Sequence, residues 1–322
     1  MSSSTARALR PDRVERLSEL RESVHKALHG KAEPVELAII SLLARGHVLV
    51  EDVPGVGKTT LARALAKALG SKMNRVQFTS DLLPSDLLGV SVFDQKKGDF
   101  TLRRGPVFTN VLLADEINRA SPRTQSALLE AMNDGQVSID GQTLPLPSPF
   151  LVLATQNPQE FAGTFPLPES QLDRFMVRLS LGYPSSDVET RLILDGSRDR
   201  VADVESVFTP ETFLRLQNDV DDIRLDSALA TYLQALIAAT RSSSNISLGA
   251  STRAAINLAQ AARARALLHG RDYCIADDIH DLATPMLSHR VRLSAITEGY
   301  SPSREEAEST VRDIITRVPV PI

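Results

Sequence analysis

The most constraining feature of the sequence is the segment HVLVEDVPGVGKTTLARALAKALG, residues 47–70. A short apolar run passes into a Pro/Gly turn and then into an Ala/Leu-rich stretch that Gly70 can end. This order predicts a strand, a turn and a helix. Backbone N–H groups and the positive end of the helix dipole converge on such a turn, so an anion can bind there. A chain built on this unit is expected to be an α/β protein.

The turn also carries the residue types that a phosphate-binding loop needs. Its glycines let the backbone wrap closely around phosphate, Lys58 can reach the β- and γ-phosphates, and the hydroxyl of Thr59 can bind Mg²⁺. The candidate nucleotide-binding residues are Pro54, Gly55, Val56, Gly57, Lys58, Thr59 and Thr60. One position departs from the G-x-x-x-x-G-K-[ST] pattern, because Asp52 replaces its first glycine. An ordinary glycine-containing turn is the alternative interpretation.

The segment VLLADEINRA is an apolar strand that ends in two adjacent carboxylates, Asp115 and Glu116. Burying two carboxylates together is unfavourable unless a cation or a reacting group uses them. We expect Asp115 to hold Mg²⁺ through its water shell and Glu116 to orient and polarise the attacking water. The alternative is that both residues only cap a helix.

A third apolar strand, in FLVLATQNP, ends in the amides Gln156 and Asn157. An amide at that position could contact the γ-phosphate and help to position the water, because it both donates and accepts hydrogen bonds. A turn-forming Asn before Pro158 is the alternative. The order of the three segments along the chain favours the phosphate-sensing role for Asn157.

The rest of the chain divides into a part with strands and a helical part. Helices are expected from Pro11 and over 34–43, and strands over 74–78, 111–114 and 150–154 predict a parallel sheet. Residues 87–108 and 134–150 are expected to form two hairpin inserts. Beyond 183–186 the pattern is helical, over 187–198, 226–240, 251–268, 276–287 and 303–317. The expected organisation is a disordered N-terminus at 1–10, a nucleotide-binding core at 11–184 and an all-α lid at 185–322.

Composition restricts the functional class. The 322 residues are 42% hydrophobic and 24% charged, as in globular proteins, and the single cysteine, Cys274, can form neither an internal disulfide nor a Cys-based zinc cluster. A net charge of −4 provides no general attraction for nucleic acid. No apolar segment is long enough to span a membrane, and the N-terminus does not resemble a signal peptide. We expect a cytoplasmic protein that does not bind nucleic acid.

Five ordered motifs, EDVPGVGKTT, ADEINRAS, ATQNP, FPLPESQLDRF and LGASTRAA, resemble those of the MoxR family of AAA+ ATPases over nearly the whole chain. The resemblance implies an αβα P-loop ATPase core followed by a small all-α lid, assembled as a ring that is usually a hexamer. It also implies that Asn157 is the sensor-1 residue, Arg174 an arginine finger for the neighbouring subunit, and Arg253 the sensor-2 arginine.

For both arginines the alternative is a structural role, and one histidine is expected to have a structural role. Arg174 could form an internal salt bridge with Asp173 or Glu169, and Arg253 could be a solvated charge at a helix start. His47, which alternates with apolar neighbours, is expected to be a packed side chain and not a ligand.

The expected function is ATP hydrolysis, with ATP and Mg²⁺ as cofactors, by a chaperone-like ring that remodels or matures protein partners. Relatives in this family are associated with metal cofactor insertion and with von Willebrand factor A-domain partners, so these are implied by resemblance alone. The alternative is an ATP-gated regulatory or scaffold protein with little turnover. A helicase-like motor is disfavoured by the acidic net charge.

Overall fold

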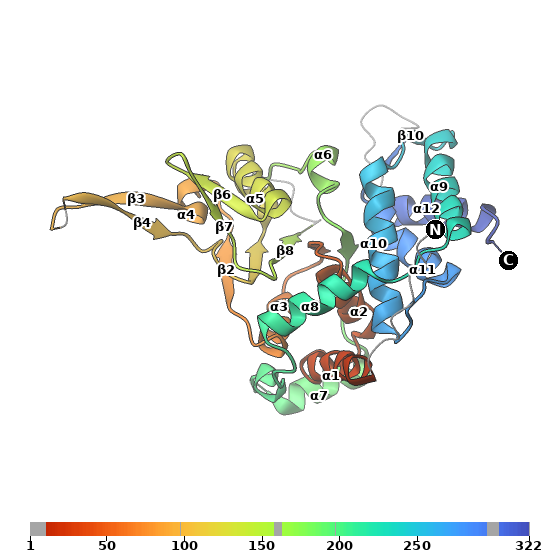
Figure 1. Cartoon of the computed structure of the whole chain (residues 1–322), viewed down its shortest axis with the longest axis horizontal. Helices are drawn as coiled ribbons and strands as arrows, with labels where there is room; N and C mark the ends of the chain where they lie inside the picture. The colour runs from red at the N-terminus through yellow and green to blue at the C-terminus, as the bar shows by residue number, and fades with distance from the viewer. Residues whose placement is uncertain (1–10, 97, 158–162, 197, 295–302, 322) are drawn as a thin grey trace, which may run out of the picture.

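A five-stranded parallel sheet forms the centre of the computed structural model, which describes residues 11–96, 98–157, 163–196, 198–294 and 303–321 (Figure 1). The strand order is β2-β5-β8-β1-β9, and each neighbouring pair is parallel. The strands are β1 (Val48–Glu51), β2 (Met73–Gln77), β5 (Val111–Asp115), β8 (Leu151–Gln156) and β9 (Val177–Leu179). The α/β fold with a parallel sheet is confirmed, whereas β9 was not predicted, because it has only three residues and one of them is Arg178.

The sheet is buried on both faces, which explains its continuous apolar runs. Along β1, Val48 and Val50 belong to one apolar core, while Leu49 between them belongs to a second core on the opposite face. The first core also holds residues of α1 (Pro11–Ala27), α2 (Ala32–Leu43) and α3 (Lys58–Ala68), and the second holds residues of α4 (Pro84–Leu88) and α5 (Pro122–Asp134). Helices therefore cover both faces, as in an αβα sandwich.

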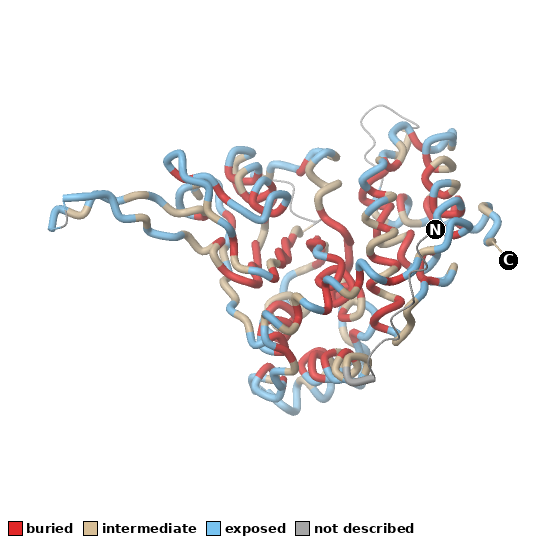
Figure 2. The backbone as a smooth tube through the Cα atoms, in the orientation of Figure 1, coloured by how far each residue is buried: buried red, intermediate tan, exposed pale blue. Residues whose placement is uncertain are grey.

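Both predicted hairpin inserts are present. One pairs β3 (Gly89–Asp94) with β4 (Asp99–Arg104), and the other pairs β6 (Gln136–Ile139) with β7 (Gln142–Pro145). Asp140 and Gly141 both have positive φ at the tip of the second hairpin, as a tight two-residue turn requires. The β3–β4 hairpin extends away from the body of the molecule, and its outer part is mostly exposed (Figures 1 and 2).

The described residues of the C-terminal part are mainly helical, and they include a short antiparallel pair, β10 (Ile246–Leu248) with β11 (Arg292–Leu293). Its helices are α7 (Ser186–Asp195), α8 (Pro210–Asp221), α9 (Ser227–Ser242), α10 (Thr252–Leu268), α11 (Ala276–Leu287) and α12 (Arg304–Arg317). Helix α8 was not predicted, although Thr209 caps its first turn. Residues 1–10, expected to be disordered, lie outside the described residues, and the 184/185 domain boundary stays a prediction.

No helix in the described ranges is long and apolar enough to cross a membrane. His47 is buried immediately before β1, where its Nε2 donates to the carbonyl of Met132 at 2.9 Å and its Nδ1 accepts from the Val152 N–H at 3.1 Å. The expectation of a packed histidine is confirmed. Burial lowers the pKa of His47 to about 4, because the charged imidazolium would lose its hydration.

This depressed pKa predicts that the fold is less stable in mild acid. Below pH 6.5 the unfolded chain binds a proton on His47 that the folded chain does not, so stability falls as the pH falls towards 4. Between pH 7 and 5.5 the contribution is about 1 kcal/mol, measurable by urea unfolding at the two pH values. His47→Gln should reduce the pH difference by that amount, and the exposed-site control His280→Gln should not. An unchanged difference in His47→Gln would contradict this account.

Candidate active site

The predicted site residues meet because parallel strands end at one edge of the sheet. Asp115 ends β5, Gln156 ends β8, and β1 ends immediately before the loop that leads into α3. A cavity of about 350 Å³ lies at this edge. It is lined by Pro54, Gly55, Gly57, Lys58, Thr59, Thr60, Arg75, Gln77, Asp115, Glu116 and Asn157. The three motifs that were separate in the sequence therefore form a single cavity.

The loop before α3 presents backbone to this cavity. Gly57, the N-cap of α3, has φ +106° and Gly55 has φ +85°, conformations that favour glycine. No side chain caps the first turn of α3, so its N–H groups are available to an anion. A Cβ at Gly55 would meet no atom within 4 Å, so the backbone angle and not lack of space requires glycine there.

Lys58 lies at the base of the same loop. Its Nζ donates to the carbonyl oxygen of Asp52 at 2.5 Å. Burial lowers the pKa of Lys58, while the nearby carboxylates of Asp52, Asp115 and Glu116 act in the opposite direction. A phosphate group in the cavity would stabilise the charged form of this ammonium and compete with the Asp52 carbonyl for it.

Asp115 is held from two sides. Its Oδ1 accepts from Thr155 Oγ1 at 2.6 Å, and its Oδ2 accepts from Nη2 of Arg75 at 2.6 Å. One carboxylate and the Thr59 hydroxyl in one cavity suit Mg²⁺, which binds oxygen ligands and keeps several waters. Within the described ranges no group of three or more His, Cys, Asp or Glu side chains is placed to hold a metal ion. The Mg²⁺ would compete with Arg75 for Asp115.

Glu116 occupies a strained position. Its φ of +56° is in the left-handed region, which is uncommon for residues other than glycine, and its N–H donates to Thr155 Oγ1 at 2.8 Å. The carboxylate forms an ion pair with Arg119 at 2.9 Å. Strain of this kind clusters at functional sites. The turn directs Glu116 to the cavity wall, where it can act on a bound molecule.

A second cavity, of about 500 Å³, adjoins the first. Pro54, Gly55, Gly57 and Thr60 line both. Leu28, Tyr183 and Leu192 are among the residues that give the second cavity an apolar wall, and Val56 lines it too. A polar cavity for phosphates beside a partly apolar one has the dimensions and chemistry of a nucleotide site.

Arg174 and Arg253 do not line either cavity. They line a third one of about 230 Å³ together with Asp173. Arg174 follows the short helix α6 (Glu169–Leu172) and donates to the carbonyl of Leu129 at 2.5 Å, while its Nε is buried without a partner. Arg253, in the first turn of α10, is exposed. The structure thus brings the two arginines together, away from the phosphate cavity of their own chain.

The salt-bridge alternative for Arg174 is not observed. Asp173 pairs with Arg290 at 3.4 Å, and Glu169 pairs with Arg292. Both carboxylates that could have neutralised Arg174 therefore have other partners. Its guanidinium is bound by a carbonyl group instead of by a carboxylate.

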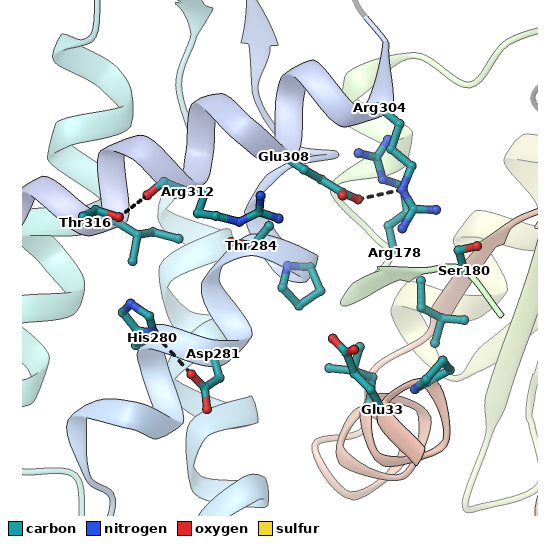
Figure 3. Close-up of a pocket in the computed structure, with 15 residues that line it drawn as sticks. Glu33, Arg178, Ser180, His280, Asp281, Thr284, Arg304, Glu308, Arg312 and Thr316 are labelled. Atoms are coloured by element: carbon teal, nitrogen blue, oxygen red, sulfur yellow. Dashed lines mark hydrogen bonds and ion pairs between the residues drawn. The ribbon is translucent and has the colours of Figure 1, made fainter. Parts of the chain in front are cut away.

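The largest of these cavities, about 540 Å³, lies elsewhere, between β9, α11 and α12 (Figure 3). Its walls carry Arg178 and Arg304, but their charges are already balanced. Arg178 pairs with Glu51 at 3.3 Å and Arg304 with Glu308 at 2.6 Å. Cavity size therefore does not identify the reactive site, whereas the convergence of Lys58 and the two carboxylates does.

Comparison with known proteins agrees with this geometry. Residues 47–177 match the ATPase family associated with various cellular activities (AAA), and residues 238–316 match the AAA lid domain. The fold and site therefore define an AAA+ ATPase, a class that binds nucleotide.

Individual relatives are similar over most of the chain. The uncharacterized protein YeaC of Bacillus subtilis is 48% identical over 94% of this chain and 93% of its own. Chaperone MoxR1 of Mycobacterium tuberculosis is 41% identical over 87% of this chain and 77% of its own. A crystal structure of a protein described as an ATPase, from Cytophaga hutchinsonii, matches with a TM-score of 0.87 and 37% sequence identity. The match covers 97% of this chain and 96% of the Cytophaga hutchinsonii chain. The chain belongs to the MoxR family of AAA+ ATPases.

Three residues of the site were missed by sequence reasoning: Thr155, Arg75 and Gln77, the last residue of β2. Thr155, only 1% exposed, connects Asp115 to the backbone of Glu116. Its signal was a hydroxyl residue near the end of an otherwise apolar strand. Arg75 lies on β2, the edge strand beside β5, and pairing β2 with β5 is what places it next to Asp115. Strand order cannot be read from local sequence, so Arg75 gave no signal.

Thr155→Val should disrupt the carboxylate pair while keeping the side-chain shape. The change removes the donor to Asp115 and leaves the Glu116 N–H without its acceptor, so we expect a loss of about 1–3 kcal/mol in the free energy of unfolding. Urea denaturation measures this loss. Thr231→Val, at an exposed position on α9, is the matched control and should cost much less. Equal effects of the two changes would contradict the connecting role of Thr155.

Proposed function

We propose that this protein binds ATP with Mg²⁺ in the two adjoining cavities and hydrolyses it to ADP and phosphate. The observation that carries the proposal is the convergence of Lys58, Asp115 and Glu116 on one cavity beside an uncapped helix N-terminus. Thr59 and Asp115 would hold Mg²⁺, which supplies neutralisation of charge on the phosphate oxygens. The base and ribose occupy the second cavity, beside Tyr183 and Leu28.

Different residues of the chain then have different roles in hydrolysis. Lys58 and the N–H groups of the first turn of α3 hold the phosphates, and Asn157 contacts the terminal one. Glu116 accepts a hydrogen bond from the attacking water, orients it and polarises it. To do so, its carboxylate must leave Arg119, with which it is paired at 2.9 Å. Release of this ion pair is therefore part of activation.

The positions of Arg174 and Arg253 support a ring. Neither side chain lines the phosphate cavity of its own chain, yet both line one shared cavity. Two cations in one place suit the phosphates of a nucleotide bound to a neighbouring copy. We assign Arg174 as the arginine finger and Arg253 as the sensor-2 arginine, both acting at that interface. A hexamer is the ring size expected for this family.

Protein partners are the proposed targets of the ring. The β3–β4 hairpin exposes Phe93 and Phe100, at 51% and 67%, as an edge-to-face pair with ring centroids 5.4 Å apart. Exposed aromatic side chains on a projecting element are suited to binding another protein. Maturation of partner proteins, metal cofactor insertion, a von Willebrand factor A-domain partner and a cytoplasmic location belong to the same proposal, and they rest on the family.

One observation favours the alternative of an ATP-gated scaffold with little turnover. Each reactive side chain is engaged by the protein itself: Lys58 by the Asp52 carbonyl, Asp115 by Arg75 and Glu116 by Arg119. These contacts must be replaced before reaction, which favours a slow basal rate. Steady-state ATPase assays with and without a client separate the two functions, because a scaffold would hydrolyse little ATP in either case.

Glu116→Gln should bind ATP with normal affinity but hydrolyse it about 10²–10⁴ times more slowly, because the amide cannot accept the proton of the attacking water. Calorimetry measures binding and phosphate release measures turnover. Glu205→Gln removes an exposed carboxylate paired with Lys26 and is the matched control. Hydrolysis at the unmutated rate in the assembled Glu116→Gln protein would exclude Glu116 as the catalytic carboxylate.

Mixing two inactive variants tests whether Arg174 acts on a neighbouring subunit. Lys58→Ala subunits cannot use their own site but still carry Arg174, whereas Arg174→Ala subunits bind ATP and provide no finger. We expect each variant alone to be nearly inactive and the mixture to regain ATPase activity, because some interfaces combine an intact site with an intact finger.

Sedimentation of each variant with a non-hydrolysable ATP analogue checks that it assembles, because lost assembly would mimic lost catalysis. If verified mixed rings do not exceed the summed rates of the separate variants, the result contradicts the action of Arg174 on a neighbouring subunit.

A further inference from the structure

Asp52 occupies the position where the phosphate-loop pattern has glycine, and the residue is 7% exposed. Its Oδ2 accepts hydrogen bonds from the Oγ of Ser180 at 2.9 Å and from the N–H groups of Leu181 at 2.5 Å and Gly182 at 2.8 Å. Its Oδ1 accepts from the Val53 N–H at 3.2 Å. A buried carboxylate with four donors is strongly held, because bonds to a charged acceptor are the strong ones.

A second buried charge holds the other side of the same segment. The Nζ of Lys31, at the start of α2, donates to the carbonyls of Gly182 at 2.9 Å and Tyr183 at 2.7 Å. The carboxylate of Asp52 therefore binds N–H groups of the segment 180–183, and the ammonium of Lys31 binds its carbonyls. We call this arrangement the 180–183 clamp.

The clamp joins the two halves of the proposed nucleotide site. Asp52 directly precedes the loop that lines the phosphate cavity, and its own carbonyl binds Lys58. Tyr183 and Pro184 line the adjoining cavity, as does Lys31. Asp52 thus fixes the wall of the second cavity relative to the phosphate loop, and Lys31 fixes the same wall relative to the start of α2.

We propose that Asp52 is a positioning residue that sets the wall of the base and ribose cavity relative to the phosphate loop. The chain favours adenine nucleotide over free diphosphate through this contact. Glycine at position 52 would complete the loop pattern, but it would remove the carboxylate that binds the N–H groups of the segment 180–183. The Asp52 carboxylate also lies near Lys58, so its removal leaves the phosphate half more positive.

The two halves of the site should therefore respond in opposite directions to Asp52→Gly. We expect the dissociation constant for ADP to rise roughly tenfold or more, because the preformed wall is lost. The dissociation constant for inorganic pyrophosphate should stay the same or fall, because a negative charge is removed. Calorimetric titration of the full-length protein with each probe measures both constants. A role confined to folding would weaken both ligands alike.

Ser180→Ala tests the same clamp without altering either cavity, because Ser180 donates to Asp52 and lines neither of them, and it should also weaken ADP more than pyrophosphate. If Asp52→Gly shows no native unfolding transition, this second variant is used for the test in its place. Asp140→Gly is the matched control, because this exposed hairpin residue already has φ +49° and should leave both constants unchanged.

The inference rests on the proposed nucleotide site, but the two fail differently. An unmutated protein that binds neither ADP nor pyrophosphate would refute the proposed function. If the unmutated protein binds ADP, the clamp variants decide the inference. Variants that lose both ligands equally, or that lose neither, would overturn the clamp as the determinant of base and ribose binding.

Discussion

The parallel register of β5, β8 and β1 is the constraint on which the site depends. Parallel strands send all their carboxyl ends to one edge, so Asp115, Gln156 and the loop after Glu51 are neighbours although they are far apart in sequence. Burial of both sheet faces fixes this register, because a slip of one residue would exchange the two apolar cores. The chemistry at the edge is therefore specified by packing several residues away from it.

Within that frame, the reactive groups are held by one another. Thr155 orders both members of the carboxylate pair, while Arg75, Arg119 and the Asp52 carbonyl engage Asp115, Glu116 and Lys58. A buried or half-buried charge is unfavourable without such partners. A bound nucleotide has to replace the same contacts that stabilise these groups. Stability and activity are therefore coupled at this site.

The site residues predicted from local sequence are those that lie within a single motif. The loop before α3, Asp115 and Glu116 at the end of β5 and Asn157 after β8 line one cavity, and each was singled out because strand ends and glycine turns have strong local signals. Arg75 and the role of Asp52 were beyond that reasoning. Their partners lie 40 or more than 120 residues away, and only strand order and the path of the chain after β9 bring them together.

The same limit applies to the fold. Strand β9 is too short and too polar to have a recognisable pattern, and the placement of Arg174 and Arg253 in one cavity brings together residues that are far apart in the sequence. Residues whose function depends on such non-local contacts cannot be assigned by periodicity. They can be assigned only by resemblance or by a structure.

The first apolar core has a mechanical consequence. It runs without interruption from α3 and one face of the sheet into α8, α10 and α11, so the C-terminal helices share their interior with the nucleotide-binding part. Such an interior is densely packed and resists being opened. We therefore expect a movement of these helices relative to the sheet to be a sliding of packed surfaces by small steps, in place of a swing about a free linker.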